Sequence, residues 1–225
     1  MGLVSMARGR KVCEFSKDQA QVAFINAAAS LLNQKPYTDI SLRELATLAG
    51  QNVAMVAYYF GSKEALFVEL IKRHLQESQH QDLNARAPSA LQLDPRVQIK
   101  QLIRRYISLH KQHPWLARFI VDNVISKDGP LRKIFVSEVI QQNAETLGLA
   151  VNQLIRSSVS QNVINPEYLR VSIISMIAFP FVAQALLTEA FDFDVHSINT
   201  EEWVEHNYRL IMTGCGVDTC LSNKE

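Results

Sequence analysis

Apolar residues recur at helical spacing in successive segments along most of the chain. In the first segment, Phe24, Ile25, Ala28, Leu31 and Leu32 share one face of a helix over 19–32. No run of alternating residues resembles a strand meander. The pattern therefore predicts an all-α protein. The expected helices cover residues 19–32, 42–49, 53–60, 63–80, 97–112, 114–125, 131–159, 166–190 and 201–213.

Residues that favour helix ends mark the limits of the short N-terminal helices. Ser41 stands three positions before Glu44, which is the spacing of a capping box. Gly50 follows the helix that Ser41 opens, in a position where a left-handed residue is favoured. Asn52 and Ser62 precede the next two helices as caps. The segment 41–60 is therefore expected to form two short helices joined by a turn, as in a helix-turn-helix.

The composition is that of a globular protein with an ordinary core. The chain has 225 residues, of which 48% are hydrophobic and 20% charged, and this length allows one or two domains. Its three cysteines are odd in number and form no C-x-x-C pair, so we expect neither a disulfide framework nor a zinc ribbon, and we expect a reducing, cytoplasmic location. Residues 171–188 carry no charge, but we interpret them as a core or interface helix and not as a membrane span.

Charge is distributed unevenly between the two ends, although the net charge is only +1. Residues 1–17 hold four basic residues and one acid, whereas 189–225 hold eight acids and two basic residues. A basic arm can approach phosphate, while an acidic end faces away from it. With the prolines of segment 82–94 as a boundary, we expect a basic arm over 1–16, a helix-turn-helix domain over 17–81 and a larger helical domain over 82–225.

The second helix of the expected motif presents an uncharged face. Val53, Ala54, Ala57 and Tyr58 point outward on a helical wheel. Methyl groups and an aromatic edge suit contact with bases in a major groove. A plain helical bundle fits the same spacing, so spacing alone leaves both interpretations open.

The residues of this segment resemble a known family. SLRELA at 41–46, AG at 49–50 and YYFGSKEAL at 58–66 are similar to the N-terminal domain of TetR-family transcriptional regulators, over roughly residues 20–70. The resemblance implies an all-α homodimer, with a helix-turn-helix domain followed by a larger helical domain for ligand binding and dimerisation. It also implies a repressor that a small molecule releases from a palindromic operator in double-stranded DNA.

The resemblance carries the family's DNA-contacting positions onto this sequence. Arg43 matches a contact from the first helix of the motif, and Tyr59 and Lys63 match contacts to phosphate. The start of the recognition helix corresponds to Asn52, Val53, Ala54 and Met55. We expect base contacts from Val53, Met55 and Tyr58.

Two positions depart from the family pattern. Ala57 stands where a tyrosine is frequent, and Tyr58 is the candidate to replace its backbone contact. Lys35 and Pro36 stand where a glycine usually follows the first helix.

The rest of the chain gives no support for an enzyme, a cofactor or a metal. No glycine-rich phosphate loop or nucleophile elbow occurs. His110 and His113 are spaced to share a metal ion, but no third ligand is evident, so pocket-lining or exposed histidines explain them better.

Large apolar residues in the C-terminal part suggest a pocket for a mostly apolar effector. Pro180 lies inside an expected helix, where it frees a carbonyl and can open space. Taken singly, each of the large apolar residues is better explained as part of a simple core, and the pocket is inferred from their density. The candidate pocket residues are His110, Trp115, Phe119, Phe135, Met176, Phe179 and Gln184.

The last two helices are candidates for the subunit interface. Helix 166–190 is apolar nearly all round, and helix 201–213 offers Trp203, Val204, Leu210 and Ile211. The sequence thus predicts a homodimeric, ligand-responsive regulator. Two alternatives remain: a helical enzyme or small-molecule carrier whose N-terminal domain does not read DNA, and an adaptor that binds protein through residues 41–66.

Overall fold

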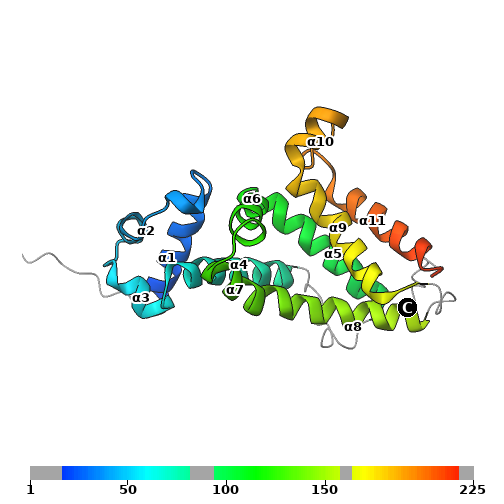
Figure 1. Ribbon diagram of the computed structural model, residues 1–225, viewed down its shortest axis with the longest axis horizontal. Helices are drawn as coiled ribbons and strands as arrows, with labels where there is room; N and C mark the ends of the chain where they lie inside the picture. The colour runs from blue at the N-terminus through cyan, green and yellow to red at the C-terminus, as the bar shows by residue number, and fades with distance from the viewer. Residues whose placement is uncertain (1–16, 82–93, 158–163, 218–225) are drawn as a thin grey trace, which may run out of the picture.

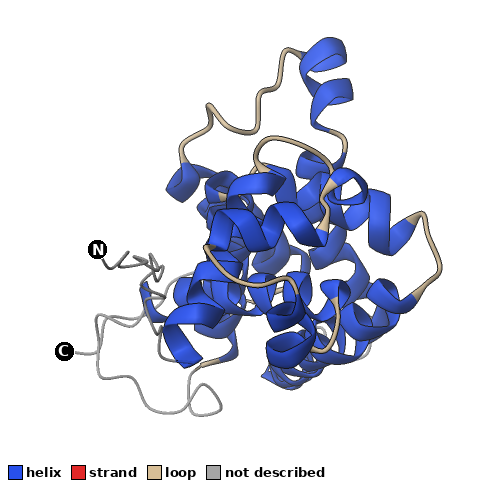
Figure 2. Cartoon of the chain, turned by 90° about the vertical axis from the view of Figure 1, so that its left-hand side faces the viewer, coloured by secondary structure: helices blue, strands red, loops and turns tan. Residues whose placement is uncertain are grey.

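The computed structural model describes residues 17–81, 94–157 and 164–217. Every regular element in these ranges is helical (Figure 2). The all-α prediction is therefore confirmed for this part of the chain. The predicted basic arm, residues 82–93 of the predicted boundary segment and the end of the helix predicted over 131–159 lie outside the described residues.

The N-terminal part consists of four helices and one short turn of 3-10 helix. In Figure 1, α1–α3 form one end of the molecule and α4 runs from them toward its centre. Their bounds are α1 Lys17–Leu32, η1 Tyr37–Asp39, α2 Leu42–Ala49, α3 Ala54–Phe60 and α4 Lys63–Gln81.

The helix ends follow the predicted capping residues. Ser41 Oγ accepts a hydrogen bond from the Glu44 amide while Glu44 Oε2 accepts one from the Ser41 amide, which completes the capping box. Gly50 ends α2 with φ 64°, a conformation that glycine adopts without a steric penalty. Asn52 and Ser62 accept hydrogen bonds from the first turns of α3 and α4. These local signals fix the short turn that sets α3 against α2.

The C-terminal part is a larger bundle that includes two π-helical turns. Helix α10 projects from the bundle at the top of Figure 1. The bounds are α5 Pro95–Gln112, α6 Trp115–Ile120, η3 Val121–Ile125, α7 Pro130–Phe135, η4 Val136–Ile140, α8 Gln141–Ser157, α9 Pro166–Val182, α10 Gln184–Phe191 and α11 Thr200–Gly214.

The prediction of one helix over 166–190 is wrong in one respect, because the structure has two helices there. Helices α9 and α10 meet at an angle of 78°, with Ala183 between them. Pro180 has no amide hydrogen and so removes one hydrogen bond from the last turns of α9. His196 Nε2 lies 3.2 Å from Gln184 Oε1, and this contact holds the first turn of α10 against the following loop.

Two hydrophobic cores hold the molecule together. The first joins α1–α4 to residues of α6, η3, α7 and η4 and to Leu109 at the end of α5. The second joins α5, α8, α9 and α11. The first core therefore extends across the predicted boundary at residue 82, and the N-terminal helices share their interior with α6 and α7.

No single described helix is long and apolar enough to cross a membrane, and only the bent pair α9 and α10 passes such a test jointly.

Candidate nucleic-acid interface

The outward face of α3 is the one predicted from the helical wheel. Val56 is buried against the first core, whereas Ala54 and Ala57 are exposed. Val53 is 38% exposed and Tyr58 is 73% exposed. Because no charged residue lies on α3, this face can approach base edges without stripping water from an ionised group.

Three of the candidate DNA-binding residues also have structural roles. Asn52 Oδ1 accepts a hydrogen bond from the Ala54 amide at 2.9 Å and so caps α3. Met55 is half-buried and packs against the first core. Tyr59 is also half-buried, with its ring 6.5 Å from that of Phe24. Met55 and Tyr59 therefore lie beside the outward face of α3 and not at its centre.

Basic side chains lie on the helices that precede and follow α3. Arg43 is exposed on α2. Lys63 begins α4, where its ammonium group donates a hydrogen bond to the main-chain oxygen of Tyr37 at 2.9 Å. Burial lowers the pKa of Lys63. Its charge is thus partly withdrawn from water and held at the edge of the motif.

A carboxylate close to this surface is neutralised within the chain. Lys35 Nζ lies 2.5 Å from Glu44 Oε1. This hydrogen bond, with those from Ser41, lowers the pKa of Glu44 to about 2. Lys35 therefore offsets a negative charge that would otherwise repel a phosphate near α2.

The seven candidate pocket residues do not line one hollow. Trp115, Phe119 and Phe135 belong to the first core, and Met176 packs against the second. Phe179 is 54% exposed on the outer side of α9. They are divided because three of them lie on α6 and α7, which complete the first core, whereas the other two lie on α9.

His110 and Gln184 are connected through two residues outside the predicted pocket set. The His110 ring lies 4.9 Å from the ring of Phe181, which lies 6.4 Å from the ring of His196. His196 in turn contacts Gln184. This series of polar and aromatic side chains joins α5 to the junction of α9 and α10. Its members are far apart in sequence, so spacing gave no signal for it.

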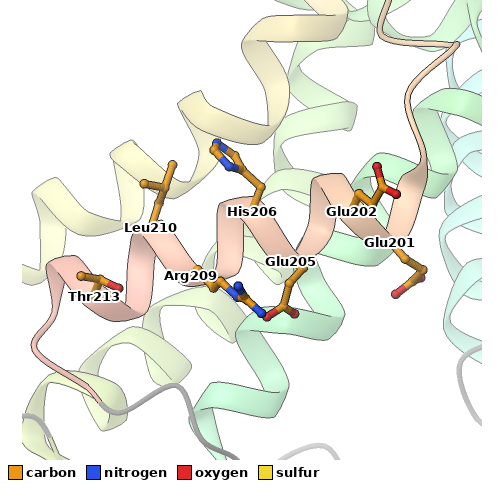
Figure 3. A pocket seen from close by; sticks show the side chains of 7 residues that line it. All are labelled: Glu201, Glu202, Glu205, His206, Arg209, Leu210 and Thr213. Atoms are coloured by element: carbon orange, nitrogen blue, oxygen red, sulfur yellow. The ribbon is translucent and has the colours of Figure 1, made fainter.

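Two hollows among the described residues lie on the outer surface and contain none of the seven candidates. One follows the exposed side of α11, where the side chains project from successive turns (Figure 3). It is lined by Glu201, Glu202, Glu205, His206, Arg209, Leu210 and Thr213. The second is lined by Asp128, Arg132, Lys133, Val136, Ser137 and Gln141. Both are open to solvent.

Two of the four residues predicted for the subunit interface on α11 are buried within their own chain. Val204 and Ile211 face the second core, so assigning them to an interface is wrong. Trp203 packs against the same core and its ring lies 5.2 Å from that of Phe193. Only Leu210 is exposed. An amphipathic helix buries one stripe, and the sequence did not show which stripe faces α5.

His113 lies beside His74 of α4, with ring centroids 3.8 Å apart, and not in a pair with His110. Across residues 17–81, 94–157 and 164–217, no three His, Cys, Asp or Glu side chains are placed to hold a metal ion.

Known proteins resemble this chain in part of its sequence and in its fold. Residues 24–70 match the family described as bacterial regulatory proteins, tetR family. The probable HTH-type transcriptional regulator YttP of Bacillus subtilis is 29% identical over 118 residues, 52% of this chain and 56% of YttP. The HTH-type transcriptional regulator EthR of Mycolicibacterium smegmatis is 30% identical over 135 residues, 60% of each chain. The chain thus matches little more than half the length of either relative.

The likeness extends further in three dimensions. The transcriptional regulator FadR from Bacillus subtilis, solved in complex with stearoyl-CoA, superposes with a TM-score of 0.63. The superposition covers 88% of this chain and 99% of that one, at 16% sequence identity. At this identity the two proteins share a fold, including the helical bundle beyond residue 94.

Proposed function

Since its N-terminal domain belongs to the tetR family of bacterial regulatory proteins, we propose that the chain is a DNA-binding transcriptional regulator. The observation that carries the proposal is the uncharged, exposed face of α3 flanked by Arg43 and Lys63. Side chains on α3 read bases in the major groove, and the flanking cations hold phosphates.

The regulator acts as a homodimer. Large apolar side chains are exposed on α9, α10 and α11, more than a monomeric surface usually carries. These are Tyr168, Val171, Ile174, Phe179, Val182, Leu186, Phe191 and Leu210. A second copy of the chain is the partner that fits, because exposed apolar side chains occur on all three helices and residues 171–188 carry no charge. Two-fold symmetry then sets the two α3 helices about 34–36 Å apart on a palindromic operator.

A small, mostly apolar effector releases this repressor from DNA. FadR holds stearoyl-CoA in its solved structure, which supports an acyl or similar apolar ligand for a protein of this fold. Phe119 and Phe135 are buried in the first core. An effector that reaches them must displace α6 or α7, and that displacement supplies the difference in affinity between the two states that a switch requires.

Selection of duplexes from random-sequence DNA tests the proposal directly. A regulator enriches one palindrome, whose affinity falls steeply with salt. A helical carrier or enzyme that does not read DNA enriches no sequence, although it still binds apolar molecules. Sequence-blind binding would therefore favour that alternative. A thermal-shift screen of apolar acids, followed by operator release with each hit, identifies the effector.

A further inference from the structure

An aromatic cluster joins α6 to the turn that precedes the helix-turn-helix. The ring of Tyr37 in η1 meets Phe67 of α4 edge-on at 4.9 Å and Phe119 of α6 edge-on at 5.6 Å. Phe67 and Phe119 stack with their planes 13° apart. Trp115, one turn before Phe119, continues the cluster along α6. Edge-to-face pairs of this kind prefer defined geometries, so a shift of Phe119 displaces Tyr37.

The same tyrosine holds the lysine at the start of α4. Lys63 Nζ lies 4.1 Å from the centroid of the Tyr37 ring and donates a hydrogen bond to the main-chain oxygen of Tyr37. The Tyr37 hydroxyl donates a hydrogen bond of 3.2 Å to Glu64 Oε1, and this bond holds the neighbouring carboxylate in place. Three contacts of Tyr37 therefore determine where the Lys63 ammonium group and the Glu64 carboxylate lie.

We propose that Tyr37 is a positioning residue for DNA binding, which transmits the placement of Phe119 on α6 to the ammonium group of Lys63. The proposal rests on the proposed function, because it treats Lys63 as a phosphate contact. The hydrogen bond and the ring contact both weaken steeply as their partners separate. A movement of α6 by less than the width of a side chain therefore changes the direction in which Lys63 presents its charge.

This route differs from a tilt of α4 as a rigid body. It runs from α6 through η1 to the first residue of α4 and requires no change in the separation of the two α3 helices. It also predicts reciprocity: DNA that binds Lys63 in the place where Tyr37 holds it stabilises this contact and so disfavours the displaced position of Phe119.

A double-mutant cycle on operator affinity separates positioning from packing. The operator is the duplex enriched from random-sequence DNA. The two substitutions are Phe119→Leu and Lys63→Met. Methionine keeps an unbranched apolar side chain at position 63 but carries no charge. We expect Phe119→Leu to weaken binding about fivefold when Lys63 is present. In the Lys63→Met background the same change has less than about a twofold effect. Equal effects in both backgrounds overturn the proposal.

Leu116→Ala is the matched control. Leu116 lies on the same helix and is buried in the same core, but it has no ring to contact Tyr37. Its effect on operator affinity is expected to be the same with and without Lys63. If Leu116→Ala couples to Lys63 as strongly as Phe119→Leu does, general loosening of the core explains the result, and the proposal fails. Phe119→Met replaces Phe119→Leu if the latter does not fold.

An NMR measurement on the full chain without DNA provides a second test. The ε-methylene of Lys63 lies near the Tyr37 ring, and we expect its proton signals upfield of those of a free lysine. In Phe119→Leu these signals move toward the free value, and in Leu116→Ala they stay in place. Unchanged signals in Phe119→Leu overturn the proposal even if DNA binding is normal. If no duplex is bound at all, the proposed function fails, while this measurement still reports whether Phe119 positions Lys63.

Discussion

The imidazole of His110 stacks on the ring of Tyr106, one turn earlier on α5, with centroids 4.2 Å apart and planes 20° apart. Burial lowers the pKa of His110 to about 4 and raises the pKa of Tyr106 to about 12. Burial beside His74 also lowers the pKa of His113 to about 4. Both His110 and His113 are therefore neutral in the folded protein near neutral pH.

The lowered pKa values of His110 and His113 predict a loss of stability in mild acid. An unfolded chain binds protons on these histidines near pH 6.5, whereas the folded chain binds them only near pH 4. Between these values the unfolded state holds more protons, so the free energy of unfolding falls as the pH is lowered through this window. His110→Phe keeps a ring on Tyr106 and removes one titrating group. Urea unfolding at about pH 7 and about pH 5 should show a smaller difference for the variant than for the parent protein. An equal difference contradicts the assignment.

Removal of the α2 cap is expected to destabilise the N-terminal helices. Ser41→Ala removes the two hydrogen bonds that the Ser41 hydroxyl makes with Glu44, at a cost of about 1 kcal/mol in the free energy of unfolding. Thr47→Ala is the control, because Thr47 is exposed within the same helix. Urea unfolding should leave the control unchanged or slightly more stable, since alanine favours helices. A loss as large in Thr47→Ala would show that the cap is not the cause.

Loss of Arg43 should weaken DNA binding without weakening the fold. Arg43 is exposed, so Arg43→Ala is expected to leave the melting temperature near that of the parent. The plot of log affinity against log salt should lose about one unit of slope for each phosphate contact removed. Lys127→Ala, in the exposed loop after η3, removes an equal charge outside the helix-turn-helix and should leave this slope intact. If both variants lower the slope equally, the effect is one of net charge and not of contact.

Charge on the exposed face of α9 should separate the two subunits. Val171 is 66% exposed, and Val171→Glu places a carboxylate within the proposed interface, where an unpaired charge costs several kcal/mol. Sedimentation should then show a folded monomer with weakened operator binding. Trp203→Glu is expected instead to unfold the chain, because Trp203 packs against the second core. A Val171→Glu protein that remains dimeric would exclude α9 from the interface.

Local signals in the sequence were sufficient for the N-terminal helices. Ser41, Gly50 and Asn52 each act through neighbours a few residues away, and each adopts its predicted role. The outward face of α3 followed from helical periodicity alone. The contact of Tyr37 with Phe119 could not be predicted in this way, since it depends on where α6 packs. No pattern within either segment records that packing.

In the C-terminal part, the sequence was still less able to predict how the helices pack. The apolar residues of 166–190 predicted one helix in a core or a subunit interface, but the helix breaks at Ala183, and Phe179 and Leu186 are exposed in the single chain. Periodicity likewise identified α11 without showing that Val204 faces α5. Which side of a helix is covered depends on its neighbours in space.

The first core has a consequence for the exchange of parts between regulators. Helix α4 contributes Leu66 and Leu70 to the interior that α6 and α7 complete, and its Lys72 pairs with Glu138 of η4 at 3.0 Å. A hybrid protein that joins residues 17–81 to the body of a relative leaves these side chains against unmatched partners. We expect such a hybrid to fold well only if α6, η3, α7 and η4 are transplanted with the N-terminal helices. For engineering a sensor with a new input, the transferable unit is therefore discontinuous in sequence.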